Sequence, residues 1–256
     1  MNGNEIEKRI EQLGGYSTAL IAAIRVMDQG RYILLPLLED EALKDTLAVR
    51  LKNTHGAYAY NHLVPILAHD LIRDCSRIFL DAGDKACSLC NLHRKAASND
   101  VLDVLRSKFR NIPDQFSEVR IYDLKLTEDD QKKYFANMRE DQKNRYEEDF
   151  KSAWADLSAF VSGLEKNETA LKIKTFRDKY FAHLEMQPLN QEPAPYNVEN
   201  LGLKFNDVFA FMDECIKCCV NLVRLITGTT HVVGSFAEVH KKRGASMWTV
   251  LINGGK

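Results

Sequence analysis

The sequence predicts an all-α fold, a helical bundle, and three observations support this prediction. Apolar residues recur every three to four positions along most of the 256 residues, which is the spacing of one helix face. Strand signals are confined to two short β-branched runs, at residues 119–124 and 231–233, too few for a sheet that carries the fold. Neither an internal repeat nor a long linker interrupts the chain, so a single domain over residues 1–256 is expected.

The first expected helix covers residues 6–27, where apolar side chains lie at helical spacing. The pair Gly14-Gly15 predicts an interruption or a kink, and Gly30 predicts the end of the helix, because glycine is a weak helix former and a common stop signal. Pro36 is expected to begin a second, short acidic segment.

A longer helix is expected over residues 56–80, since an apolar stripe that includes Leu63 runs through it. Pro65 lies inside this stretch. Proline removes a backbone donor and clashes with the preceding turn, so a kink or a break is expected near Leu63.

Further helices are expected wherever the helical spacing returns. They cover residues 88–97, 101–109, 127–164, 168–183, 205–226 and 236–251. The first two are separated by Ser98-Asn99-Asp100, a capping sequence. Residues 187–202 hold three of the six prolines and are expected to form a loop.

Composition indicates a cytoplasmic protein with no strong general attraction to nucleic acid. The formal net charge is -1, so any RNA has to be held by a local cleft instead of a global basic field. No apolar run is long enough to span a membrane, and residues 1–15 lack the apolar core of a secretory signal. No membrane association is therefore expected.

The most informative segment is Arg177-Asp178-Lys179-Tyr180-Phe181-Ala182-His183. It places a permanent cation, a carboxylate and a group that titrates near neutral pH within about two helical turns. An Arg followed by His after four to six residues is a permissive pattern, and it also occurs at residues 50–55 and 224–231. Only in the segment that begins with Arg177 is the Arg followed by a polar residue.

This segment resembles the signature of the HEPN superfamily, and most closely its abortive-infection AbiU-type branch. Residues 76–81, followed by residues 88–92, are similar to a helix end and the following helix start of that branch, and residues 240–251 are similar to its C-terminal helix. The resemblance implies a HEPN-type helical bundle with additional peripheral helices. It also implies a homodimer with a composite active site that cleaves RNA without a metal or another cofactor, often as a toxin or in phage defence. An antitoxin or another defence partner is possible.

The residues themselves suit RNA cleavage. RNA carries its own nucleophile, the 2′-hydroxyl, so an enzyme needs to move protons and to stabilise charge on the phosphorus. His183 is the candidate for proton transfer, and Arg177 the candidate for binding phosphate oxygens. Asp178 is a third catalytic candidate that orients one of them, while Arg77 and Lys179 are candidate substrate contacts.

A continuous α-helix would separate the two main catalytic candidates. Six residues at about 100° each leave Arg177 and His183 about 120° apart around the helix axis. One helix therefore cannot aim both at one phosphate unless it ends first or a second chain contributes. A two-fold dimer brings two copies of the motif together.

A purely structural explanation of the motif remains open. Ile173, Phe176 and Tyr180 form an apolar stripe, so this helix is expected to pack, with Arg177 at its surface and His183 as a cation near its end. The alternative function is a non-catalytic HEPN-like helical dimer that serves as an RNA-binding or partner-binding scaffold. Growth arrest with RNA fragmentation, lost on His183→Ala, would distinguish the two.

Two other residue patterns allow a site. Cys87 and Cys90 with His93, and the cluster of Cys215, Cys218 and Cys219, have the tight spacing of zinc ligands. Reduced thiols packed on helices are the favoured interpretation. His55, His62 and His69 are seven residues apart, too far along a helix to share a metal ion, and either line a cleft or form a polar seam.

One position departs from the HEPN toxins that are controlled by nucleotide transfer onto tyrosine. In those toxins a Tyr stands two residues after the motif His, whereas this chain has Glu185 there. Control by adenylylation of such a tyrosine is therefore not expected.

Overall fold

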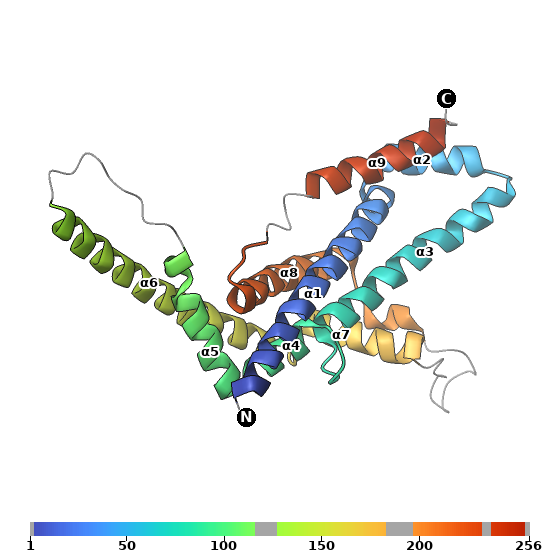
Figure 1. The fold of residues 1–256 in the computed structure, drawn as a ribbon. Helices are drawn as coiled ribbons and strands as arrows, with labels where there is room; N and C mark the ends of the chain where they lie inside the picture. The colour runs from blue at the N-terminus through green and yellow to red at the C-terminus, as the bar shows by residue number, and fades with distance from the viewer. Residues whose placement is uncertain (1–2, 116–126, 183–196, 232–236, 254–256) are drawn as a thin grey trace.

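A computed structural model describes residues 3–115, 127–182, 197–231 and 237–253 of the chain. All regular secondary structure in these ranges is helical, with no strand, and this confirms the all-α prediction (Figure 1). The weak strand signal at residues 119–124 and most of the one at 231–233 lie outside the described residues. The expectation of a single domain stays a prediction.

Two helices organise the packing. Helix α1 (Gly3–Glu39) runs diagonally through the molecule and contacts α3, α4, α5, α8 and α9. Helix α8 (Phe205–Thr227) lies beside it and buries an apolar face that includes Met212, Cys219 and Leu222. The main hydrophobic core is built on these two helices and takes buried residues from every helix from α3 to α7.

Helix α1 is longer than the sequence predicted. It continues through Gly14-Gly15 and through Gly30, ends at Glu39, and contains Pro36. A glycine inside a helix costs only about 1 kcal/mol, and the buried residues on both sides, such as Leu20 and Leu34, outweigh that cost. The predictions of an end at Gly30 and of a separate segment from Pro36 were wrong.

Helix α2 (Glu41–Leu51) begins directly after α1. The Asp40 side chain accepts a hydrogen bond from the Leu43 backbone N–H at 2.9 Å, which caps the first turn. The end of α1, helix α2 and helix α9 (Ala237–Asn253) meet around a small second core that contains Leu37, Leu43, Leu47 and Trp248.

Helix α3 (His55–Cys75) is continuous through Pro65, so the predicted break does not occur. Pro65 is exposed, and the helix is held beyond it by buried residues such as Leu71 and Cys75. Leu63, which was expected in the core, is 38% exposed. A single π-helical turn, η1 (Ser76–Leu80), extends α3 to the predicted end.

The middle of the chain follows the prediction closely. It contains α4 (Leu89–Ala96), α5 (Asn99–Arg110), the 3-10 turn η2 (Ile112–Gln115) and α6 (Glu128–Gly163). Side chains of Ser88 and Thr127 cap α4 and α6. The N-terminal half of α6 projects away from the body of the molecule (Figure 1), and its first fully buried residue is Phe150.

The rest of the chain carries the motif and the C-terminal helix. Helix α7 (Glu168–Phe176) is followed by a second π-helical turn, η3 (Arg177–Ala182), and later by the 3-10 turn η4 (Val198–Leu201). Residues 187–196 of the expected loop lie outside the described residues. Helix α9 runs along the end of α1, where a side chain at Gly244 would overlap the carbonyl oxygen of Tyr32.

Candidate functional site

Helix α7 fixes the start of the motif. The Asn167 side chain accepts a hydrogen bond from the Ala170 backbone N–H at 2.9 Å and caps the helix. Ala170, Ile173 and Phe176 are buried, and the helix contacts α3, α8 and η1. Arg177 therefore directly follows a helix that the core holds in place.

The motif itself is π-helical. Residues Arg177–Ala182 form η3, and the second segment singled out in the sequence contains the other π turn, η1. Single π turns inside helices occur frequently at functional sites. The estimate of 120° between Arg177 and His183 assumed a continuous α-helix, so it does not hold for this segment. The sequence pattern gave no sign of either π turn.

The Arg177 side chain is accessible and its ion pair is local. Its Nε donates to Asp178 Oδ1 at 2.7 Å, and the exposed fractions of the two side chains are 37% and 54%. An exposed pair contributes little to stability. Asp178 thus lies where it can orient the guanidinium, and a phosphate can compete for the same donors.

His183 and Glu185 lie outside the described residues. Lys179, a candidate substrate contact, lies on η3 and is partly exposed.

Helix α3 brings a second imidazole to the motif. The His69 ring lies 4.6 Å from the Tyr180 ring and 5.2 Å from the Phe176 ring, measured between centroids. Burial lowers the pKa of His69 below its ordinary value. His55 and His62, by contrast, are exposed on the same helix. In the sequence the three histidines form one series with equal spacing, and nothing in that spacing sets His69 apart from His55 and His62.

Two arginines follow His69 along α3 and η1. Arg73 pairs with Asp70, and Arg77 Nη2 lies 3.1 Å from Asp74 Oδ1, with 64% of the Arg77 side chain exposed. Burial raises the pKa of Asp74, and the Arg77 charge opposes this shift. Because η1 contacts α7, and α3 contacts both α7 and η3, the fold brings the Arg77 segment to the motif.

One of the other two Arg-to-His matches has a clear structural role. Arg224 binds Asp149 through Nη1 at 2.5 Å, and its guanidinium carbon lies 5.3 Å from the centroid of the Phe109 ring. It joins α8 to α6 and α5. Arg50, in the third match, lies in the last turn of α2 and is exposed.

The cysteines are packed thiols. All six are free, and Cys75, Cys215 and Cys219 are buried, where burial raises their pKa values. His93 stacks on Trp154, and its Nε2 lies 2.9 Å from Ser158 Oγ. Among the described residues, no group of three or more His, Cys, Asp or Glu is arranged to hold a metal ion.

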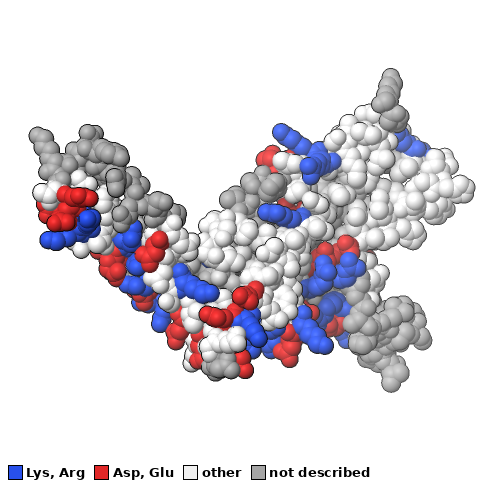
Figure 2. All heavy atoms as spheres, in the orientation of Figure 1, with Lys and Arg blue, Asp and Glu red and all other residues white. Residues whose placement is uncertain are grey.

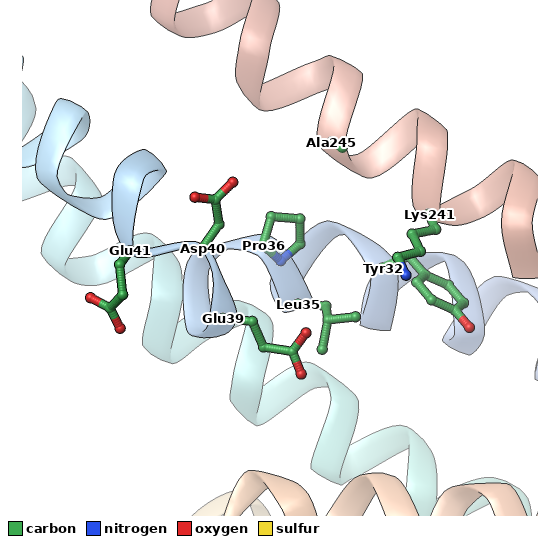
Figure 3. Close-up of a pocket in the computed structure, with 8 residues that line it drawn as sticks. All are labelled: Tyr32, Leu35, Pro36, Glu39, Asp40, Glu41, Lys241 and Ala245. Carbon is green, nitrogen blue, oxygen red and sulfur yellow. The ribbon is translucent and has the colours of Figure 1, made fainter.

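A pocket of about 500 Å³ lies elsewhere, between α1, the start of α2 and α9 (Figure 3). Its lining combines Tyr32, Leu35 and Pro36 with the acidic residues Glu39, Asp40 and Glu41. None of its lining residues belongs to α3, α7 or η3. It is separate from the motif.

The all-α fold, with the Arg177 segment directly after a packed helix, agrees with a HEPN-type helical fold. The chain belongs to the HEPN AbiU2 family, described as AbiU2, which matches residues 4–244. It is thus an abortive-infection-related, HEPN-like protein. No significant match was found to a curated protein or to a solved structure. Across the ranges that the structure covers, no helix is both long and apolar enough to cross a membrane.

Proposed function

We propose that this protein is a metal-independent endoribonuclease of the cytoplasm that acts as a toxin or phage-defence effector. The observation that supports this most is the state of Arg177. Its guanidinium directly follows a packed helix, is partly exposed, and pairs with the neighbouring Asp178 carboxylate. A cation in this position is held by the fold and is accessible to a phosphate.

The proposed reaction uses the substrate's own 2′-hydroxyl. His183 carries out one of the two proton transfers, from the 2′-hydroxyl or to the leaving 5′-oxygen, and solvent water carries out the other. Arg177 binds the oxygens on which charge develops, and Asp178 orients the guanidinium. The O–P bond to the 2′-oxygen forms as the bond to the 5′-oxygen breaks. The products carry a 2′,3′-cyclic phosphate and a 5′-hydroxyl.

The binding of RNA in this proposal is local. On the face seen in Figure 2, basic and acidic side chains are interspersed, mainly along α6 and the adjoining edge. Among the described residues on that face, neither sign forms a large continuous area. The cations at the motif, Arg177 and Lys179, together with Arg77 on η1, are the candidate contacts to phosphates.

A homodimer completes the proposed site. The N-terminal part of α3 exposes Tyr58, Leu63 and Ile66 on the helix that contacts the motif, and exposed apolar residues of this kind suit a protein interface. In the dimer, Arg177 of one protomer works with His183 of its partner. An antitoxin or another defence protein restrains the activity.

The test is cleavage of single-stranded RNA by the purified protein. We expect cleavage to survive EDTA, and 2′-deoxy substitution at the cut to abolish it. Arg177→Ala and His183→Ala should each remove activity from a folded protein, whereas Arg50→Ala and His231→Ala should leave it largely intact. Binding of RNA without cleavage would indicate the scaffold function, and activity that needs added metal would contradict the mechanism.

Co-expression of the two inactive variants with different tags tests the composite site. A heterodimer of Arg177→Ala with His183→Ala has one site with both groups and one with neither. Since one of the two sites is intact, about half of the wild-type activity should return. Such a recovery supports the shared site. An inactive, verified heterodimer contradicts it.

A further inference from the structure

Three aromatic rings from two helices meet beside Arg177. Phe176 and Tyr180 lie 5.3 Å apart between ring centroids, and the His69 ring from α3 lies against both. The His69 and Tyr180 rings meet edge to face at 65°, a favourable geometry for aromatic pairs. The position and tilt of Tyr180 are thus set by two other rings.

The three rings differ in how deeply they are buried. Phe176 is buried, His69 is partly buried, and Tyr180 is 40% exposed. Because its burial lowers the pKa of His69, the imidazole is mainly neutral at pH 7 and packs as an uncharged ring. The cluster therefore has a fixed inner part and an accessible tyrosine at its surface.

Two arginines lie about one turn from members of this ring cluster. Arg177 is three residues before it on η3. Arg73 is one turn beyond His69 on α3 and is exposed. Proteins commonly hold single-stranded nucleic acid with an accessible aromatic ring and nearby positive charges, with bases on the rings and phosphates on the cations.

We propose that Tyr180, supported by His69 and Phe176, is a stacking surface for an unpaired nucleobase next to the phosphate that Arg177 binds. This inference rests on the proposed function and adds a substrate class to it, RNA whose base at the cut is unpaired. Tyr180 is a specificity-determining residue in this arrangement, and His69 is a positioning residue.

The stacking surface requires an unpaired base because only such a base has an accessible ring face. In a duplex both faces of a base are covered by its neighbours, whereas a base in a loop or a single strand offers a face to an aromatic side chain. Loss of one such stacking contact weakens binding by roughly tenfold or more. The same loss at a paired substrate has no effect, because nothing stacks there.

Binding of 2-aminopurine RNA tests the stacking surface without any need for cleavage. The probe is a short single-stranded RNA in which every 2′-oxygen is methylated, with 2-aminopurine at one internal position. The fluorescence of this base falls when it stacks on an aromatic ring. We expect wild-type protein to quench it, and Tyr180→Ala to lose the quenching and to bind about tenfold more weakly.

Matched variants separate stacking from folding. Tyr180→Leu keeps apolar packing against Phe176 but has no aromatic face, so it should behave like Tyr180→Ala. Tyr180→Phe and His69→Phe keep the rings and should retain the quenching. Tyr134→Ala is the control, since Tyr134 is similarly exposed but lies on the projecting part of α6.

The outcomes distinguish the stacking surface from the proposed function. Unchanged quenching in Tyr180→Leu, equal affinity for a paired probe, or no binding of any probe by the wild-type protein would each overturn the stacking surface. Quenching that depends on Tyr180, in a protein that cleaves no RNA, would support the stacking surface and contradict the nuclease.

Discussion

Two clusters in this protein use the same kinds of side chain in opposite ways. The first, which we call the α1–α9 cluster, consists of Asp28, Arg31 and Tyr32 of α1 with Asp213 of α8 and His240 of α9. Arg31 binds Asp213 through Nη1 at 2.5 Å and through Nη2 at 3.2 Å, and only 13% of its side chain is exposed. Asp28 and His240 are buried. The Arg31–Asp213 pair joins α1 to α8, and the charge of His240, on α9, acts to lower the pKa of Asp28.

The second, which we call the motif cluster, consists of His69, Phe176, Arg177, Asp178 and Tyr180. It too contains an Arg, an Asp, a His and a Tyr. Here the Arg177 ion pair is with the next residue in the chain, and both side chains are accessible. The aromatic rings, and not the charges, connect the helices.

This difference separates a structural cluster from a candidate site. An Arg that is largely buried and binds an acid from a distant helix links two parts of the fold, whereas an Arg that binds its neighbour is positioned and still accessible to a ligand. Residue type alone does not make this distinction. The distinction depends on how deeply the Arg is buried and on whether its acidic partner belongs to a distant helix or is the next residue in the chain.

Replacing Arg177 and replacing Arg31 should give the two largest effects, one on RNA cleavage and the other on stability. We expect Arg177→Ala to lower cleavage at least about 100-fold and to change the free energy of unfolding by less than about 0.5 kcal/mol. Arg31→Ala should cost roughly 2 kcal/mol of stability, because Asp28 loses a nearby cation while buried, and should leave the cleavage rate of the folded protein intact.

Urea unfolding and an RNA cleavage assay on the same preparations measure both effects. Loss of cleavage in folded Arg31→Ala would show that the α1–α9 cluster takes part in function. A large loss of stability in Arg177→Ala would show that the motif arginine is structural after all.

A glycine tests how tightly the α1–α9 cluster is assembled. A methyl group on Gly244 would overlap the carbonyl oxygen of Tyr32, which belongs to the backbone of α1. We expect Gly244→Ala to destabilise the protein by roughly 3 kcal/mol, or to release α9. Release would be visible as lost protection of the Trp248 indole N–H, which donates to the Ile33 carbonyl at 2.8 Å.

Gly15→Ala is the matched control, because Gly15 lies on α1 and a Cβ there meets no atom within 4 Å. It should stabilise the protein by about 0.5–1 kcal/mol through the better helix propensity of alanine. Equal effects of the two substitutions would contradict the close contact of α9 with α1.

Local sequence signals predicted most helices, and long-range packing decided the rest. The spacing of apolar residues located α4 and α6. The capping sequence Ser98-Asn99-Asp100 does lie at the start of α5, but the Ser98 side chain makes no capping hydrogen bond there. The glycines of α1 and the proline of α3 were expected to interrupt their helices. They do not, because buried contacts further along each helix outweigh a local cost of a few kcal/mol or less.

The candidate site was only partly predictable. The motif was visible because its residue types follow each other in the chain, and Arg177 and Asp178 do lie together. The π turns and the contact of His69 with Tyr180 depend on how α3 and α7 pack. No local pattern encodes that packing, so His69 was not separated from His55 and His62.

The smallest expected effect concerns the buried acid of the α1–α9 cluster. Burial raises the pKa of Asp28 above its ordinary value of 3.8, while Arg31 and His240 oppose this shift. Asp28→Asn removes the titration but keeps the shape. At a pH below 3.8 the carboxyl is protonated in both the folded and the unfolded chain, so it adds no pH dependence there.

Above that pH the unfolded chain releases the Asp28 proton first, which favours unfolding. Wild-type stability should therefore fall relative to Asp28→Asn as the pH rises from 3.8 to the raised folded pKa, and the difference should then stay constant. Urea unfolding of both proteins at steps from about pH 3 to 6, the range in which a carboxyl with a raised pKa titrates, measures this. A difference that changes in the opposite direction would mean that Arg31 lowers the folded pKa of Asp28 more than burial raises it, and the cluster would then be held mainly by its charges.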